Sequence, residues 1–378
     1  MSTRWSDWLA AQAQARDDAG LTRMLHPRRA EDTTIDLAGN DYLGLSVHPE
    51  VVAAAREAVA VWGGGAGASR LVTGSLVLHT HLECALADYL EQPAALVLST
   101  GYHANLALVT ALADRDTLVV SDAHIHASLI DAVRLSRAQL SVVAHNDVEA
   151  VDAALAAHAA QQPAGRALVL CESVYSVLGD RAPLAELAAV CRRHDALLVV
   201  DEAHGVGVHG PGLVARAGLG GDPHVVVTAT LSKALGAQGG AVLGAPALIE
   251  HLVNRARPFI FDTGLAPAPT AAALAALRVM RADPALGDVV ATRMADLAAS
   301  LGVEPSSGAV LSVPMPSPQA ALAAQAAALE AGVRVGCFRP PSVPDGVSRL
   351  RVTVNAGVPE DAWARAVQVL ISVTKEHA

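Results

Sequence analysis

Residues 196–205 read ALLVVDEAHG and residues 225–233 read VVVTATLSK, and these two stretches decide the fold. Each begins with an apolar run that lacks polar alternation, which predicts a strand buried on both faces. Polar side chains follow each run, with Asp201 after the first and Lys233 shortly after the second. In parallel α/β sheets, ligand-binding residues cluster beyond the carboxyl ends of the strands. The two stretches therefore predict a buried parallel sheet with a chemical site at one edge.

Similar apolar runs recur outward from these two, between Ala- and Leu-rich segments with helical spacing. They lie at 94–98, 117–121, 140–144, 167–171 and 240–243. The segments between them are long enough for crossover helices. The sequence thus predicts an α/β fold with a mainly parallel seven-stranded central sheet.

The pattern changes after about residue 275. A long Ala-rich helical stretch, a Pro- and Ser-rich turn at 313–318, short strands and a final helix from Pro359 predict a smaller α+β C-terminal domain. We therefore expect an N-terminal helical segment at 1–43, a large domain at 44–275 and a small domain at 276–378.

Composition limits the class of ligand. With 378 residues, of which 52% are hydrophobic, the chain can bury a large core, and its formal net charge of −10 offers no basic surface for nucleic acid or anionic lipid. Its four cysteines show no C-x-x-C pair, which suits a reducing compartment. The N-terminus lacks an apolar signal core, and no apolar run approaches membrane-spanning length. We expect a soluble cytoplasmic protein with a small-molecule ligand and no membrane contact.

Lys233 stands out because the only other lysine in the chain is Lys375. Arginine cannot lose its proton at ordinary pH or form an imine, whereas a desolvated lysine can do both. Asp201 and Lys233 on neighbouring strand ends match the needs of pyridoxal 5'-phosphate (PLP): an acid that holds the pyridine nitrogen protonated and an amine that forms the imine. His204 could reach the ring oxygen of that cofactor. The structural alternatives are a helix cap or internal ion pair for Asp201 and a surface loop for Lys233.

Other classes of protein fit the sequence less well. Residues 205–210 read GVGVHG, which matches the dinucleotide-binding pattern, but no long helix opens at the third glycine and the next strand ends in threonine. Acids and histidines at 201–209 form no H-E-x-x-H or comparable ligand set, so we expect no metal site. A non-catalytic binding protein of the same fold remains open, because a fold does not fix a function.

Residues 201–207 (DEAHGVG) and 230–236 (TLSKALG) resemble the signature of the α-oxoamine synthases, which are fold-type I PLP enzymes. Further blocks resemble the family in the expected order: 40–45 (NDYLGL), 67–74 (GASRLVTG), 126–128 (HAS), 145–147 (HND) and 339–344 (RPPSVP). The chain departs from the family at Gly357, where a histidine is common, and at 176–180, which lack the usual Asp-Gly-Asp.

The resemblance implies roles around the cofactor ring. Lys233 would carry PLP as a Schiff base, Asp201 would face the pyridine nitrogen, and His126 would stack on the ring. From the residues alone, a cap at a helix start is the favoured explanation of His126. The resemblance places His204 and Ser176 near the phenolic oxygen.

Glu172 would support that ring site from a second layer. The cofactor's phosphate would bind the backbone N–H groups of Gly101 and Tyr102 at a helix start, together with the hydroxyl of Thr230. Thr263 matches a hydroxyl that the other subunit lends in family members, which implies a homodimer.

The resemblance also implies the substrates. Arg351 would clamp an amino-acid carboxylate with its planar guanidinium, assisted by Asn40. Arg23 matches an arginine near the acyl substrate, and Ser342 lies in the block at 339–344. The implied reaction is a decarboxylative condensation of L-alanine with pimeloyl-CoA or pimeloyl-acyl carrier protein. A sister activity, glycine C-acetyltransferase or 5-aminolevulinate synthase, is the alternative.

Overall fold

The structure, a computed structural model, describes residues 3–19, 21–340, 343 and 345–378. Its contacts divide the chain into a short unit at Met1–Thr34 and a large unit at Ile35–Ala378. The short unit holds helix α1 (Thr3–Asp18), which buries none of its residues. Across the described ranges, no helix combines the length and apolar character needed to cross a bilayer.

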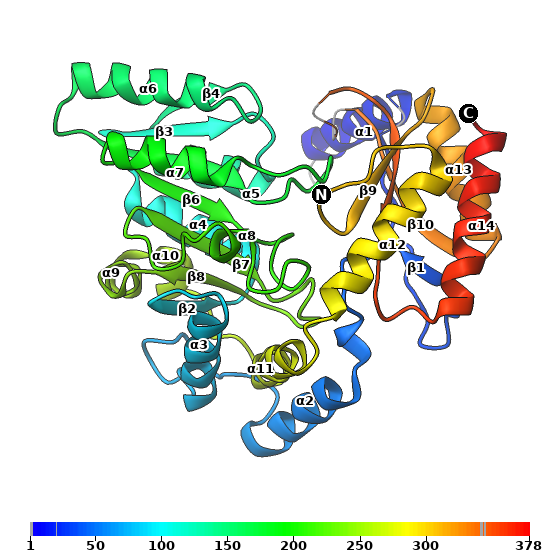
Figure 1. The fold of residues 1–378 in the computed structure, drawn as a ribbon, viewed down its shortest axis with the longest axis horizontal. Coiled ribbons are helices and arrows are strands. Elements are labelled where there is room, and N and C mark those ends of the chain that lie inside the picture. Colours follow the sequence, from blue (N-terminus) through cyan, green and yellow to red (C-terminus); the bar gives the residue numbers. More distant parts are fainter. Residues whose placement is uncertain (1–2, 20, 341–342, 344) are drawn as a thin grey trace. The chain divides into compact units, whose positions relative to one another are not determined.

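A seven-stranded sheet forms the centre of the large unit (Figure 1). Its strands, in spatial order, are β2 (Ala94–Leu98), β8 (Gly240–Gly244), β7 (Val225–Thr230), β6 (Leu197–Asp201), β5 (Arg166–Glu172), β3 (Thr117–Asp122) and β4 (Gln139–Val143). Strands β7, β6, β5, β3 and β4 pair in parallel, and β8 runs antiparallel to both of its neighbours. The predicted mainly parallel seven-stranded sheet is confirmed.

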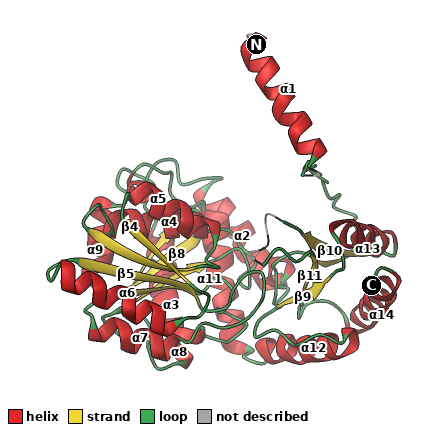
Figure 2. Ribbon diagram, turned by 90° about the horizontal axis from the view of Figure 1, so that it is seen from above, coloured by secondary structure: helices red, strands yellow, loops and turns green. Residues whose placement is uncertain are grey.

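Helices cover both faces of this sheet, as Figure 2 shows. One face packs against α4 (Gly101–Leu112), α5 (Ala127–Ser136), α9 (Pro246–Arg255) and α10 (Arg257–Ile260). The other packs against α3 (Val77–Tyr89), α6 (Val148–Gln161), α7 (Leu184–Arg193) and α11 (Pro267–Ala282). Helix α2 (Pro49–Trp62) lies against α11, and the short α8 (Leu213–Arg216) follows β6. Apolar strands without alternation are therefore explained by two hydrophobic cores, one on each face.

Strand β4 departs from that rule. Leu140 and Val142 remain exposed, at 51% and 60% of their maximal surface. Because β4 is the edge of the sheet, only its β3 side is paired and part of its apolar surface stays open.

A second, four-stranded sheet has the order β1 (Ile35–Leu37), β10 (Val333–Phe338), β11 (Arg349–Thr353) and β9 (Val310–Pro314). Helices α12 (Leu286–Leu301), α13 (Pro318–Glu330) and α14 (Glu360–Glu376) pack against it and each other. This is the predicted α+β arrangement, with one addition. Strand β1 comes from the segment expected to be helical, yet it pairs in parallel with β10. The boundaries at 43 and 275 stay predictions.

Candidate active site

Three neighbouring strand ends bring the predicted acids and the lysine together. Glu172 ends β5 and Asp201 ends β6, and the two residues are direct partners in the parallel register. Lys233 follows the end of β7 by three residues. All three line one cavity of about 250 Å³. The sheet therefore gathers two carboxyl groups and one amine at the edge where ligands are expected.

A buried asparagine that sequence reasoning missed holds Asp201 in place. Asn105 donates from Nδ2 to Asp201 Oδ2 at 2.8 Å and to Ser128 Oγ at 2.8 Å. Its Oδ1 accepts from the hydroxyl of Thr228 at 2.7 Å. The other oxygen of Asp201 accepts from the backbone N–H of Ala203 at 2.9 Å. The one signal in the sequence is an amide within the mostly apolar helix α4.

Glu172 is buried with one oxygen unused. Its Oε2 accepts from the backbone N–H of Ser176 at 3.2 Å, while Oε1 finds no hydrogen-bond partner among the described residues. Burial raises the pKa of Glu172 well above its usual range, and the nearby charge of Asp201 adds to this. A buried acid with an open acceptor beside a second acid suits a site that receives a ligand able to donate a proton.

The amine of Lys233 has a lowered pKa and so loses its proton more readily than an exposed lysine. Burial lowers its pKa to about 8, against the opposing pull of Asp201 and Glu172. Its Nζ lies 2.8 Å from Nε2 of His204. Burial, and next the charge of Lys233, hold the pKa of His204 well below its usual range, so this ring is neutral. An amine that titrates near neutral pH can act as a nucleophile and as a base.

His126 caps a helix and also lines the cavity of Lys233. Its Nδ1 accepts the backbone N–H of Ser128 at 3.2 Å and thus caps helix α5. The hydroxyl of Ser128 lies 2.8 Å from the same nitrogen. His126 also lines the cavity that holds Lys233. The predicted stacking on a cofactor ring stays a prediction.

The start of helix α4 lies on the wall of the same cavity. Thr100 caps the helix by accepting the backbone N–H of His103 at 3.0 Å, and Gly101 and Tyr102 are the first two helical residues. Their N–H groups have no acceptor within the helix. A Cβ on Gly101 would stand 3.0 Å from the side chain of Thr230, so glycine permits this close approach. These features fit the phosphate of PLP, and the carboxylate and amine at the strand ends fit its ring.

Arg351 offers a buried cation to a second cavity. It is 7% exposed, donates from Nε to the carbonyl of Ser176 at 3.1 Å, and contacts Asn40 Oδ1 at 3.3 and 3.4 Å. No carboxylate of the described ranges forms an ion pair with it. By contrast, Arg349 on the same strand is bound to Asp345 at 2.6 Å.

This second cavity, of about 570 Å³, shares lining residues with the first. The residues common to both are His126, His204 and Lys233. Arg351 and Asn40 lie on its wall together with apolar side chains. An amino acid held at Arg351 would therefore lie in a cavity that Lys233 also lines.

Ser176 lines the second cavity with Arg351 and Lys233, and its backbone groups contact Glu172 and Arg351. The contacts described above include none of the three remaining predicted residues. Thr263 is exposed and forms an isolated bridge with Ser69. Arg23 lies in the short unit and is exposed there. Ser342 lies outside the described residues.

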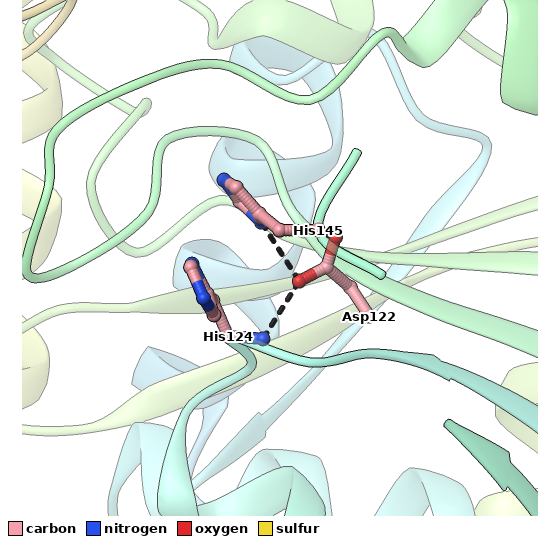
Figure 3. A group of neighbouring side chains, drawn as sticks. All are labelled: Asp122, His124 and His145. Atoms are coloured by element: carbon pink, nitrogen blue, oxygen red, sulfur yellow. Dashed lines mark hydrogen bonds and ion pairs between the residues drawn. The ribbon is translucent and has the colours of Figure 1, made fainter. Parts of the chain in front are cut away.

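Asp122, His124 and His145 form a cluster of neighbouring side chains (Figure 3). Of the three, His124 also lines the second cavity. Both ring nitrogens of His145 face carboxylates, Asp122 at 2.9 Å and Asp180 at 2.6 Å. Burial opposes charge on His145, but these two bonds outweigh it and raise its pKa. The rings of His124 and His145 stack with centroids 4.0 Å apart, so their in-plane lone pairs do not converge on one point. The geometry fits a hydrogen-bonded network better than a metal centre.

Comparison with known proteins defines the class. The model of the family "Aminotransferase class I and II" matches residues 32–370, and the chain belongs to this family. Within it, the chain is 54% identical over 369 residues to the 8-amino-7-oxononanoate synthase of Mycobacterium marinum, which covers 97% of this chain and 94% of that protein. It is 55% identical over 370 residues to the enzyme of the same name from Mycolicibacterium smegmatis, covering 97% and 96%.

Solved structures agree with this placement. Serine palmitoyltransferase from Sphingomonas wittichii matches with a TM-score of 0.89 and 30% identity over 98% of this chain and 97% of that one. An 8-amino-7-oxononanoate synthase from Francisella tularensis matches with a TM-score of 0.75 over 92% and 99%, and at 24% identity it supports the fold alone. The predicted fold class is confirmed.

Proposed function

We propose that this chain is a PLP-dependent C-acyltransferase that condenses L-alanine with a pimeloyl thioester and releases carbon dioxide, giving 8-amino-7-oxononanoate for biotin synthesis. The observation that carries the proposal is a pair of cavities that share Lys233 as a lining residue, the second of which is also lined by Arg351, a cation without an ion pair among the described residues. The two relatives named above are called synthases of this product and match almost the whole chain.

PLP supplies an electron sink for the charge that develops at the amino acid's Cα. Asp201 would face its pyridine nitrogen, and the start of helix α4, at Gly101 and Tyr102, would bind its phosphate. Lys233 would hold the cofactor covalently until the amino acid takes its place. Arg351 would position the substrate's carboxylate, and the amine of Lys233 would remove and return a proton at Cα.

The second cavity supports a long acyl chain over a short one. Its apolar wall is formed by Ile125, Ile130, Val177, Leu178 and Phe338. Each buried methylene contributes up to about 0.8 kcal/mol, which an acetyl group largely forfeits. The thiol carrier is CoA or an acyl carrier protein. The alternative is a sister condensation that joins glycine to acetyl-CoA or succinyl-CoA.

We further propose that the enzyme works as a cytoplasmic homodimer in which Thr263 reaches the partner's phosphate site. The exposure of Thr263 supports this, and four free cysteines suit a reducing compartment. Mixing Thr263→Ala with Lys233→Ala protein, both weak alone, should restore activity if each dimer then holds one intact site. Absence of any gain after subunit exchange would count against the shared site.

Two measurements test the main proposal. Visible absorption with and without borohydride should show PLP fixed to the parent protein and not to Lys233→Ala; fixation in that variant would refute the role of Lys233. Specificity constants should then favour alanine with pimeloyl-CoA by more than about tenfold over glycine with acetyl-CoA or succinyl-CoA. A preference for a glycine pair would assign the chain to a sister activity.

A further inference from the structure

A continuous chain of hydrogen bonds joins Arg351 to Lys233 through three side chains. Arg351 contacts Asn40 Oδ1 at 3.3 and 3.4 Å, and the hydroxyl of Tyr42 lies 3.0 Å from the same oxygen. Tyr42 Oη also lies 2.8 Å from Nδ1 of His204, whose Nε2 is 2.8 Å from Lys233 Nζ. The carboxylate clamp and the amine are therefore connected through Tyr42, which is 1% exposed.

The donor and the acceptor of each hydrogen bond in this chain can be assigned by starting at Arg351. A guanidinium only donates, so the Asn40 atom that faces it is the carbonyl oxygen. That oxygen only accepts, so Tyr42 uses its single proton to donate to Asn40. The oxygen of Tyr42 is then left to accept from His204, which requires a proton on Nδ1.

His204 carries only that one proton. Burial holds its pKa well below the usual range, and the charges of Lys233 and Arg351 act in the same direction. A neutral imidazole has one N–H, so Nε2 presents a bare lone pair. Lys233 therefore donates to His204, and the opposite direction is excluded by the proton count.

We propose that Tyr42 is a positioning residue that fixes which nitrogen of His204 bears the proton and so turns a bare nitrogen toward the amine of Lys233. The tautomer is a property of the chain itself and holds whether or not the proposed function is correct. Its catalytic consequence rests on the proposed function, in which the Lys233 amine is free whenever the amino acid has taken its place.

A bare acceptor beside Lys233 favours the protonated amine and works against desolvation. The other titratable or charged groups that face this amine are Asp201, Glu172, Arg351 and His126. Removing the hydroxyl of Tyr42 takes away none of these charges; Arg351, which also contacts that hydroxyl, keeps its contacts with Asn40 and Ser176. In Tyr42→Phe, no hydroxyl holds the proton of His204 on Nδ1. Nε2 can then carry the proton, and Lys233 loses the acceptor that faced its amine.

The direct test is nitrogen NMR of the full-length protein, labelled at histidine and freed of cofactor, since the two tautomers give distinct nitrogen signals. His204→Gln assigns the signal. We expect His204 with Nδ1 protonated in the parent and a mixed or Nε2-protonated ring in Tyr42→Phe. Tyr175→Phe is the matched control, because Tyr175 is also buried but its hydroxyl lies beside Asp122 and outside the chain that joins Arg351 to Lys233. A parent ring protonated at Nε2, or an unchanged signal in Tyr42→Phe, overturns the proposal.

A pair of Asn40 variants keeps the test decisive if Tyr42→Phe does not fold. Asn40→Ala removes the acceptor, so Tyr42 becomes free to donate to Nδ1 and the proton of His204 should move to Nε2. Asn40→Asp keeps an acceptor and should preserve the parent tautomer. The same tautomer in both variants would contradict the proposed chain of directions.

A second readout follows Lys233 itself. The pH midpoint for the rate of PLP attachment, followed by absorbance, should fall by about one unit in Tyr42→Phe because the protonated amine loses an acceptor. Tyr175→Phe should keep the parent midpoint, and an unchanged midpoint in Tyr42→Phe would remove the link to Lys233. Neither readout needs turnover, so a failed substrate assay would leave this inference intact.

Discussion

Replacing Asn105 with alanine should remove a hydrogen bond that holds the carboxylate of Asp201. Asn105 supplies one of the two hydrogen bonds seen at the Asp201 carboxylate, and its removal leaves only the backbone N–H of Ala203. A hydrogen bond to a charged group contributes about 1.5–3 kcal/mol. If half or more of that is felt when the carboxylate meets PLP, cofactor affinity should fall about 4- to 100-fold.

A second variant, at Thr228, separates the loss of the Asp201 contact from a general loss of stability. Thr228→Val removes only the hydroxyl that donates to Asn105 Oδ1 and leaves the bond to Asp201 in place, so it should cost about 1 kcal/mol of stability with little loss of affinity. Asn254→Ala is a surface control, because the one hydrogen bond of that amide among the described residues goes to the carbonyl of Glu250 in its own helix. PLP titration by absorbance and urea unfolding measure the two effects. Equal affinity losses in Asn105→Ala and Thr228→Val would refute the reasoning.

Three further changes probe the site and its surroundings. Asp201→Asn should keep the fold but lower kcat by at least about two orders of magnitude, and activity within a few-fold of the parent would make Asp201 structural. Arg351→Lys keeps the charge but loses the planar fork, so alanine binding should weaken by roughly 1–3 kcal/mol in a KM measurement, and an unchanged alanine dependence would contradict the clamp. The pKa of His145 is raised in the folded chain, so its ion pairs stabilise fully below the ordinary histidine value of 6.5 and fade as pH rises through the folded value. Asp180→Asn should therefore lower the urea midpoint more at about pH 5.5 than at about pH 9, and equal losses would show that the pair does not titrate.

The sequence predicted the strands of the large sheet to within a residue or two, because each is a short apolar run between helical segments. Strand β1 was missed, since three residues carry no periodicity and its pairing partner lies far along the chain. Asp201 and Lys233 were predicted from their own chemistry at strand ends. The roles of Asn105 and Tyr42 were not, because each acts on a residue 96 or 162 positions away and only the fold brings them into contact.

The pairing of β1 with β10 has a consequence for how the chain is made. Ile35 pairs with Val333, so this strand emerges from the ribosome about 300 residues before its partner, roughly 15 to 60 s at ordinary synthesis rates. During that interval the residues just before Asn40 lack their native neighbour. The large parallel sheet, complete by residue 244, can form first. Asn40 and Arg351 then meet only when the last strands are released, so the amino-acid clamp is among the final parts of the molecule to be assembled.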